Sequence, residues 1–129
     1  MSINFLAVLA AAFSSFILGG LWYSPALFLK PWNKAMGRTD KDNGHPAKVF
    51  GLSFIFALVA AVVFALLLGP APALSEAWKA GLLVGVGFVA MSFGINYQFS
   101  KRSTLLWVID SGYHTAQFLL YGLILGSWH

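Results

Sequence analysis

Four long apolar stretches constrain this chain more than any other feature. They run over about residues 3–23, 49–68, 80–99 and 105–128, and each is close to the roughly 20 helical residues that cross a bilayer. The stretches are continuous, whereas membrane-barrel strands would be about 10 residues long with alternating polarity. Charged residues make up only 9% of the chain, so a soluble fold of this size would expose most of its apolar surface. We therefore predict an all-α membrane protein in which residues 1–129 form one domain of four transmembrane helices.

The connections between these stretches predict how the helices are arranged. The first is a polar loop over about residues 25–48. Its start is aromatic and basic, which indicates a short segment in the headgroup region with Phe28 and Trp32 turned inward. The second connection, residues 69–73, contains two prolines, and the third, residues 100–104, is tight. Short connections place consecutive helices side by side in opposite directions, so we expect an antiparallel bundle.

The basic residues predict the orientation of this bundle. Seven of the eight lie in the first and third connections, namely Lys30, Lys34, Arg38, Lys41, Lys48, Lys101 and Arg102, and only Lys79 lies opposite. The positive-inside rule then places both connections in the cytoplasm and both termini outside. Because topology explains the net charge of +4, we expect the lipid bilayer as a partner and no nucleic acid.

Small residues recur at four-residue spacing in each stretch and predict close helix packing. They are Ala7, Ala11, Ser15 and Gly19, then Ala57, Ala61 and Ala65, then Ala77, Gly81 and Gly85, and finally Gly122 and Gly126. In a bilayer such residues let helix backbones approach closely. We expect a tight bundle and also a homo-oligomer, most simply a dimer, because a seam could be left for a second copy.

One acidic residue lies inside a stretch expected to cross the membrane. Asp110 falls about six residues into the fourth stretch, where a carboxylate is costly unless it is paired or hydrated. His114 and Gln117 follow on the same helix face, with Tyr121 further along. These residues predict a polar stripe that descends from the cytoplasmic end beyond the middle of the membrane.

The third stretch offers polar partners at matching depth. Asn96 is expected at the level of Asp110, and Ser92 at the level of His114. Four interpretations of this cluster remain open: polar contacts that fix helix register, a proton, ion or solute site, part of a metal site completed by other chains, or a catalytic triad. No complete metal-ligand set or catalytic motif is present, so we predict no metal or other cofactor and assign no catalytic residue. An enzyme is not the favoured class. With zero cysteines there is no disulfide framework and no thiolate nucleophile.

Two motifs give the chain a resemblance to a known family. Residues 20–25 read Gly-Leu-Trp-Tyr-Ser-Pro, and residues 106–114 read Leu-Trp-Val-Ile-Asp-Ser-Gly-Tyr-His. Together they resemble an uncharacterised family of small bacterial integral membrane proteins with four spans, catalogued as a domain of unknown function. The resemblance implies a multi-pass protein of the bacterial inner membrane and implies no activity. It singles out Trp22, Tyr23, Ser24, Pro25, Asp110, Tyr113 and His114.

Two functions follow as expectations. The first is binding or movement of a small solute, ion or proton at the polar stripe. Its candidate site residues are Ser92, Asn96, Asp110, Tyr113, His114 and Gln117. The alternative is a non-catalytic structural or partner subunit of a membrane complex, in which the stripe only packs helices.

Overall fold

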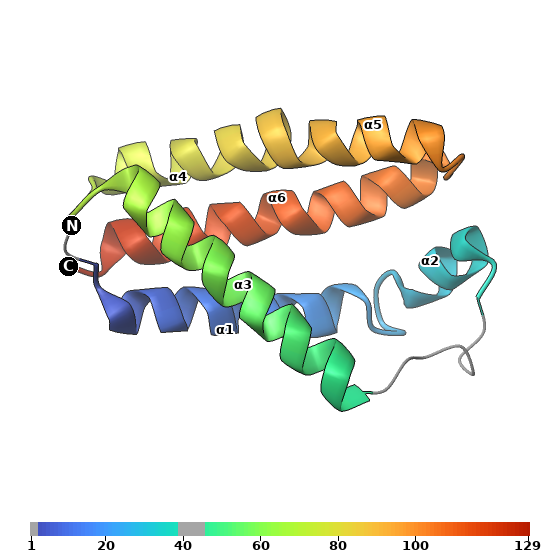
Figure 1. Ribbon diagram of the computed structural model, residues 1–129, viewed down its shortest axis with the longest axis horizontal. Helices are drawn as coiled ribbons and strands as arrows, with labels where there is room; N and C mark the ends of the chain where they lie inside the picture. Colours follow the sequence, from blue (N-terminus) through green and yellow to red (C-terminus); the bar gives the residue numbers. More distant parts are fainter. Residues whose placement is uncertain (1–2, 39–45) are drawn as a thin grey trace.

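A computed structural model describes residues 3–38 and 46–129 of the chain, and every regular element in these ranges is a helix. The helices are α1 (Phe5–Trp22), α2 (Leu29–Met36), α3 (Pro46–Leu68), α4 (Leu74–Leu82), the π-helical segment η2 (Leu83–Ala90), α5 (Met91–Phe99) and α6 (Thr104–Ser127). α4, η2 and α5 follow one another directly and form one long helix (Figure 1). The all-α prediction is therefore confirmed for the described residues. The long helix begins at Leu74, before the apolar stretch predicted over about residues 80–99. The stretch starts later than the helix because the first turns of the helix are amphipathic rather than uniformly apolar.

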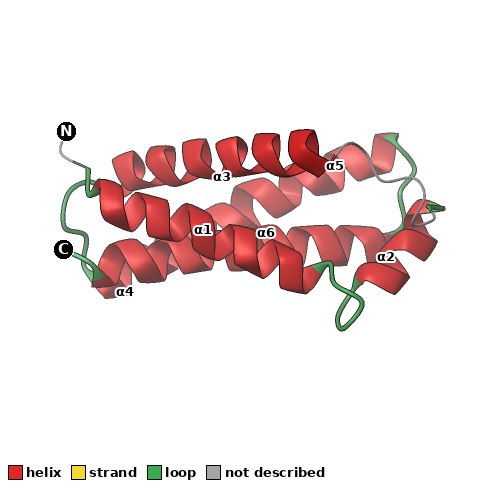
Figure 2. Cartoon of the chain, turned by 90° about the horizontal axis from the view of Figure 1, so that it is seen from below, coloured by secondary structure: helices red, strands yellow, loops and turns green. Residues whose placement is uncertain are grey.

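α1, the α4–η2–α5 helix and α6 run along the long axis of the molecule, and α3 crosses them obliquely (Figure 1). Both termini and the α3–α4 connection lie at one end, while α2 and the α5–α6 connection lie at the other (Figure 1). The view turned by 90° shows the same separation of the two ends (Figure 2). The basic residues of the described first and third connections thus lie at the α2 end of the molecule.

Within residues 3–38 and 46–129, three helices are long and apolar enough to cross a membrane: α1, α3 and the continuous helix Leu74–Phe99. Their large apolar side chains face outward, as at Ile17 (71% exposed) and Phe56 (69% exposed). Such extended apolar surface is what a lipid environment requires. By their length and composition, these helices indicate a membrane protein. α6 has 24 residues but is not among these three helices, since Asp110, His114 and Gln117 lower its apolar content.

α6 lies at the centre of the bundle, with α1 on one side and the α4–η2 helix on the other. The contact with α4 and η2 is made by small residues. A Cβ atom on Gly122 would lie 2.3 Å from the carbonyl oxygen of Ala77, and one on Gly81 would lie 2.3 Å from that of Phe118. Since real side chains do not approach so closely, only glycine permits this backbone separation. The predicted small-residue packing of these helices is confirmed.

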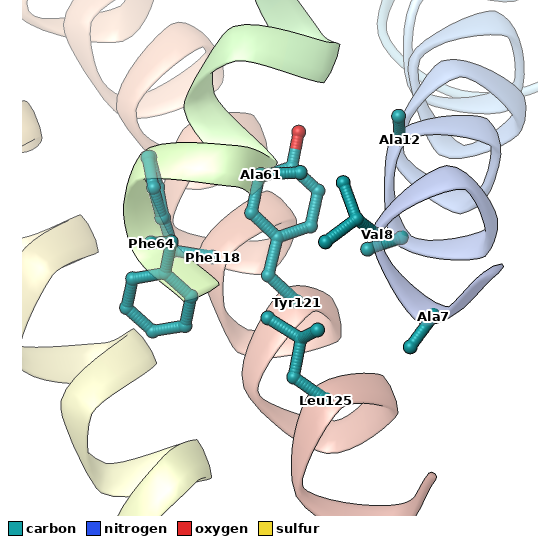
Figure 3. Close-up of a cluster of buried hydrophobic side chains, with 9 residues drawn as sticks. Ala7, Val8, Ala12, Ala61, Phe64, Phe118, Tyr121 and Leu125 are labelled. Carbon is teal, nitrogen blue, oxygen red and sulfur yellow. The ribbon is translucent and has the colours of Figure 1, made fainter. Parts of the chain in front are cut away.

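α3 crosses α1 at an angle and covers one side of the core (Figure 1). The apolar core between α1, α3 and α6 contains Tyr121, which is fully buried, with Val8 and Ala61 beside it (Figure 3). Because the Tyr121 ring fills the space between the three helices, its hydroxyl must find partners inside the protein. Those partners belong to the site described below.

α2 is the short aromatic and basic segment expected between the first two long helices. Lys30 and Lys34 are exposed, whereas Trp32 turns toward the bundle and Phe28 packs on Trp22 with ring centroids 4.9 Å apart. The helix ends at Gly37, whose φ of 70° is the left-handed conformation that glycine adopts readily. Residues 39–45 of the predicted loop, including Lys41, lie outside the described part of the chain.

Candidate functional site

Asp110 accepts three hydrogen bonds in the interior of the bundle. The Tyr23 hydroxyl donates to Oδ1 at 2.5 Å, the Trp32 indole N–H donates to the same oxygen at 3.0 Å, and the Tyr97 hydroxyl donates to Oδ2 at 2.5 Å. Asp110 itself is only 8% exposed. A carboxylate accepts hydrogen bonds at both oxygens, so three donors satisfy a group that would be costly to bury alone.

Each donor to Asp110 comes from a different part of the fold. Tyr23 follows the last residue of α1, Trp32 lies on α2, and Tyr97 lies on α5. The carboxylate on α6 therefore joins these three elements at the end of the molecule that carries α2 (Figure 1). Within the described ranges, no lysine or arginine bonds to Asp110, so its charge is stabilised by neutral donors. This arrangement fits a structural role for Asp110 as a hydrogen-bond acceptor better than a role in which Asp110 breaks these bonds to bind a proton or a ligand.

The rest of the polar stripe forms a second, separate network. His114 Nδ1 lies 2.6 Å from Gln117 Oε1, and Gln117 Nε2 donates to the Tyr121 hydroxyl at 2.8 Å. Tyr121 in turn donates to the carbonyl of Ala57 on α3 at 3.1 Å and lies 3.1 Å from the Ser15 hydroxyl on α1. Three residues of the stripe, His114, Gln117 and Tyr121, are thus joined by hydrogen bonds, whereas Asp110 is hydrogen-bonded elsewhere.

His114 and Gln117 line a cavity of about 710 Å³ between α1, α3 and α6. The apolar part of its wall comes from Phe16, Val49, Phe50, Phe56 and Phe118, and the polar part also includes Tyr23, Ser53 and Tyr113. The volume falls within the roughly 300–1,000 Å³ of small-molecule sites, which combine apolar walls with a few polar groups. Asp110 is not among the lining residues.

The two sequence motifs pack directly on each other. The Trp22 indole N–H donates to the carbonyl of Ile109 at 3.0 Å, and the Tyr113 hydroxyl donates to the carbonyl of Ser15 at 2.9 Å. Gly112 makes room for Trp22, since a Cβ atom there would lie 3.1 Å from the ring. The motifs therefore join the end of α1 to α6.

Ser24 and Pro25 have local roles in the turn after α1. The Ser24 hydroxyl donates to the carbonyl of Leu21 at 2.6 Å, and Pro25 is exposed. Neither side chain lines the cavity between α1, α3 and α6.

Ser92 and Asn96 do not join the site that their depth predicts. Both are exposed, and neither side chain bonds to Asp110 or His114 in the described ranges. Phe93 takes the predicted place of Ser92 and stacks on His114 with ring centroids 5.1 Å apart. Tyr97 takes the place of Asn96 and bonds to Asp110. The predicted cluster of four polar side chains is therefore replaced by two aromatic residues from α5.

The π-helical segment η2 accounts for this shift by one residue. Gly81 and Gly85 contact α6, and an unbroken α-helix with 3.6 residues per turn would carry that face on to Ser92 and Asn96. The wider turns of η2, at Leu83–Ala90, use up about one additional residue. Phe93 and Tyr97 therefore face α6 instead. The carbonyl of Ala90 in η2 accepts a hydrogen bond from the Trp107 indole on α6 at 2.8 Å.

A metal centre finds no support in the described residues, since no group of three or more His, Cys, Asp or Glu side chains comes together there. Sequence reasoning missed Trp32 and Tyr97 as partners of Asp110. The aromatic and basic pattern of residues 26–34 predicted that Trp32 turns inward, but it did not indicate Asp110 as the partner of the indole. No sequence signal marks the π-helical segment that positions Tyr97.

The fold and site define an all-helical membrane protein with a polar core. A family model described as a protein of unknown function, DUF1761, matches residues 6–126, and the chain belongs to this family. No curated protein and no solved structure matches the chain. The resemblance to a family of unknown function is confirmed, and the description of the family names no activity.

Proposed function

We propose that the protein is a four-span protein of the bacterial inner membrane that binds a small molecule between α1, α3 and α6. His114 and Gln117 supply the polar end of this site. The observation that carries the proposal is the cavity of about 710 Å³ that both residues line. Asp110 has a separate role in this proposal, which is to hold α2, α5 and the end of α1 on α6.

The burial of its polar residues supports α6 as the fourth span. Asp110, Gln117 and Tyr121 are 8%, 5% and 0% exposed, so these groups contact protein and would not contact lipid. At 1.5 Å per residue a helix of this length extends about 36 Å, which is enough to cross a hydrocarbon core of about 30 Å. The exposed basic residues Lys30 and Lys34 favour the α2 end as the cytoplasmic end.

The hydrogen bonds favour binding of a solute over transfer of a proton through Asp110. Both oxygens of Asp110 already accept hydrogen bonds from Tyr23, Trp32 and Tyr97. To carry a proton, Asp110 would have to break the bonds that hold three segments of the chain on α6. His114 has one bonded nitrogen, and it lines a cavity that a ligand can occupy. The cavity therefore supports a binding protein or a transport subunit better than a purely structural subunit.

A single-cysteine reporter tests whether the cavity takes a ligand. The chain has zero cysteines, so one introduced thiol is unique. Gly20 lines the cavity, and Gly51 on α3 does not; a Cβ atom at either position meets nothing within 4 Å. We expect 4-octylanisole, an apolar probe, to slow the reaction of N-ethylmaleimide with G20C in phosphatidylcholine nanodiscs. The matched control G51C should react at an unchanged rate. Equal rates for G20C with and without the probe, at every concentration, would contradict the proposal.

A further inference from the structure

We infer that the ligand of this cavity is an uncharged apolar molecule with one hydroxyl group, and that this hydroxyl donates a hydrogen bond to Nε2 of His114. The inference rests on the proposed function and adds the chemical class of the ligand. Long-chain alcohols, phenols and similar membrane-soluble alcohols share this chemistry.

The hydrogen-bond chain fixes which nitrogen of His114 carries the proton. Tyr121 donates its hydroxyl proton to the carbonyl of Ala57, so it accepts the bond from Gln117 Nε2. This orients the Gln117 amide with Oε1 toward His114. An amide oxygen only accepts, so His114 Nδ1 must donate to it. In the neutral imidazole, Nε2 is then an acceptor.

Nε2 of His114 is open to a ligand. Within the described residues, Nε2 has no hydrogen-bond partner in the protein. It is also not among the fully buried polar atoms that lack a partner, since the atom found there is Ser111 Oγ, so Nε2 is accessible. Two tyrosine hydroxyls on the same wall are already engaged, since Tyr23 donates to Asp110 and Tyr113 donates to the Ser15 carbonyl. Of the groups on this wall, His114 Nε2 is therefore the acceptor best placed to receive a donor from a ligand.

The lining of the cavity excludes a charged head group. None of its lining residues is Asp, Glu, Lys or Arg, and five are Phe or Val. His114 lies ten residues into α6, which at 1.5 Å per residue is about 15 Å from the helix start and near the middle of a 30 Å hydrocarbon core. An ion at that depth without a counter-charge is costly, whereas a hydroxyl needs only one acceptor.

Three matched probes test the inference with the G20C reporter in nanodiscs. They are 4-octylphenol, its methyl ether 4-octylanisole, and the anion 4-octylbenzoate, compared at equal mole fractions in the bilayer. We expect the phenol to slow labelling at about fivefold lower concentration than the ether, as one net hydrogen bond would allow, and the benzoate to protect least. In the double variant G20C/H114F the phenol and the ether should become equivalent, because the acceptor is lost while a ring remains against Phe93. S53A, which removes the Ser53 hydroxyl from the same wall, should keep the preference.

The outcomes separate this inference from the proposed function. If the phenol and the ether protect equally in the parent reporter, the hydroxyl assignment is wrong although the cavity still binds. Protection by the benzoate as strong as that by the phenol would overturn the uncharged ligand. If no probe protects G20C, the binding function itself fails. Since the three probes are compared first in the parent reporter, the result stands even if the His114 variant does not fold.

Discussion

Two tyrosine hydroxyls and one indole N–H converge on Asp110, and each comes from a different segment of the chain. Hydrogen bonds to a charged acceptor contribute about 1.5–3 kcal/mol each, and a buried donor left without a partner costs a comparable amount. The side chain of Asp110 thus stabilises the end of the bundle through Tyr23, Trp32 and Tyr97 together.

Replacement of Asp110 should reveal the number of donors that it satisfies. We expect D110L to lower the free energy of unfolding by about 3 kcal/mol or more, since all three donors lose their acceptor. D110N keeps one oxygen and should lose roughly half as much, and Y97F, which removes one donor, should resemble D110N. Thermal melting in detergent measures the order. Equal stability of D110L and the parent chain would contradict the assigned role.

At the scale of elements, the contact between α6 and the α4–η2 helix depends on missing side chains. A Cβ atom on Gly122 would lie 2.3 Å from the Ala77 carbonyl oxygen, whereas one on Gly51 meets nothing within 4 Å. We expect G122A to separate the helices and lower the melting temperature strongly. G51A, which makes the same chemical change on an open helix face, should be neutral or slightly stabilising because alanine favours a helix by about 1 kcal/mol over glycine. A G122A protein as stable as G51A would show that the helices do not approach this closely.

The length of the π-helical segment η2 should decide which side chains of α5 face α6. Deletion of Val86, an exposed residue within Leu83–Ala90, should convert η2 into a regular α-helix while Phe93 and Tyr97 still face α6. Insertion of one alanine at the same place should instead rotate both side chains away from His114 and Asp110. We therefore expect the deletion to melt near the parent temperature and the insertion to melt at the lower temperature of Y97F. The reverse order would contradict the register given to η2.

At the scale of the whole molecule, four spans with both termini outside is a testable arrangement. We consider cells whose outer membrane is permeabilised and whose inner membrane is intact. In these cells S127C, at the end of α6, should react with a maleimide that cannot cross the inner membrane. K34C, on exposed α2, should react only after lysis, because the positive-inside rule places α2 in the cytoplasm. Labelling of both positions from outside would leave α6 as a non-spanning helix.

The homo-oligomer also belongs to this scale and stays a prediction. Most of the small residues that suggested a surface for a second copy are used within one chain: Ala7, Ala11 and Ala61 are fully buried, and Gly81 and Gly122 contact other helices. A dimer would have to use the exposed apolar faces instead. Mass measurement in several detergents tests it, and a monomer in all of them would contradict it.

The sequence alone determined the helical class and the approximate bounds of the helices, because the length of an apolar stretch can be read from the local composition. It also determined the unusual position of Asp110 and the four-residue spacing of small residues that lets helices pack. Tertiary structure decided which side chains meet Asp110. The extra residue taken up in η2 turns Tyr97 and Phe93 toward α6 in place of Asn96 and Ser92, and depth along a helix contains no information about such a rotation. The cavity beside His114 likewise depends on the angle at which α3 crosses α1 (Figure 1), which is set by packing of side chains far apart in the chain.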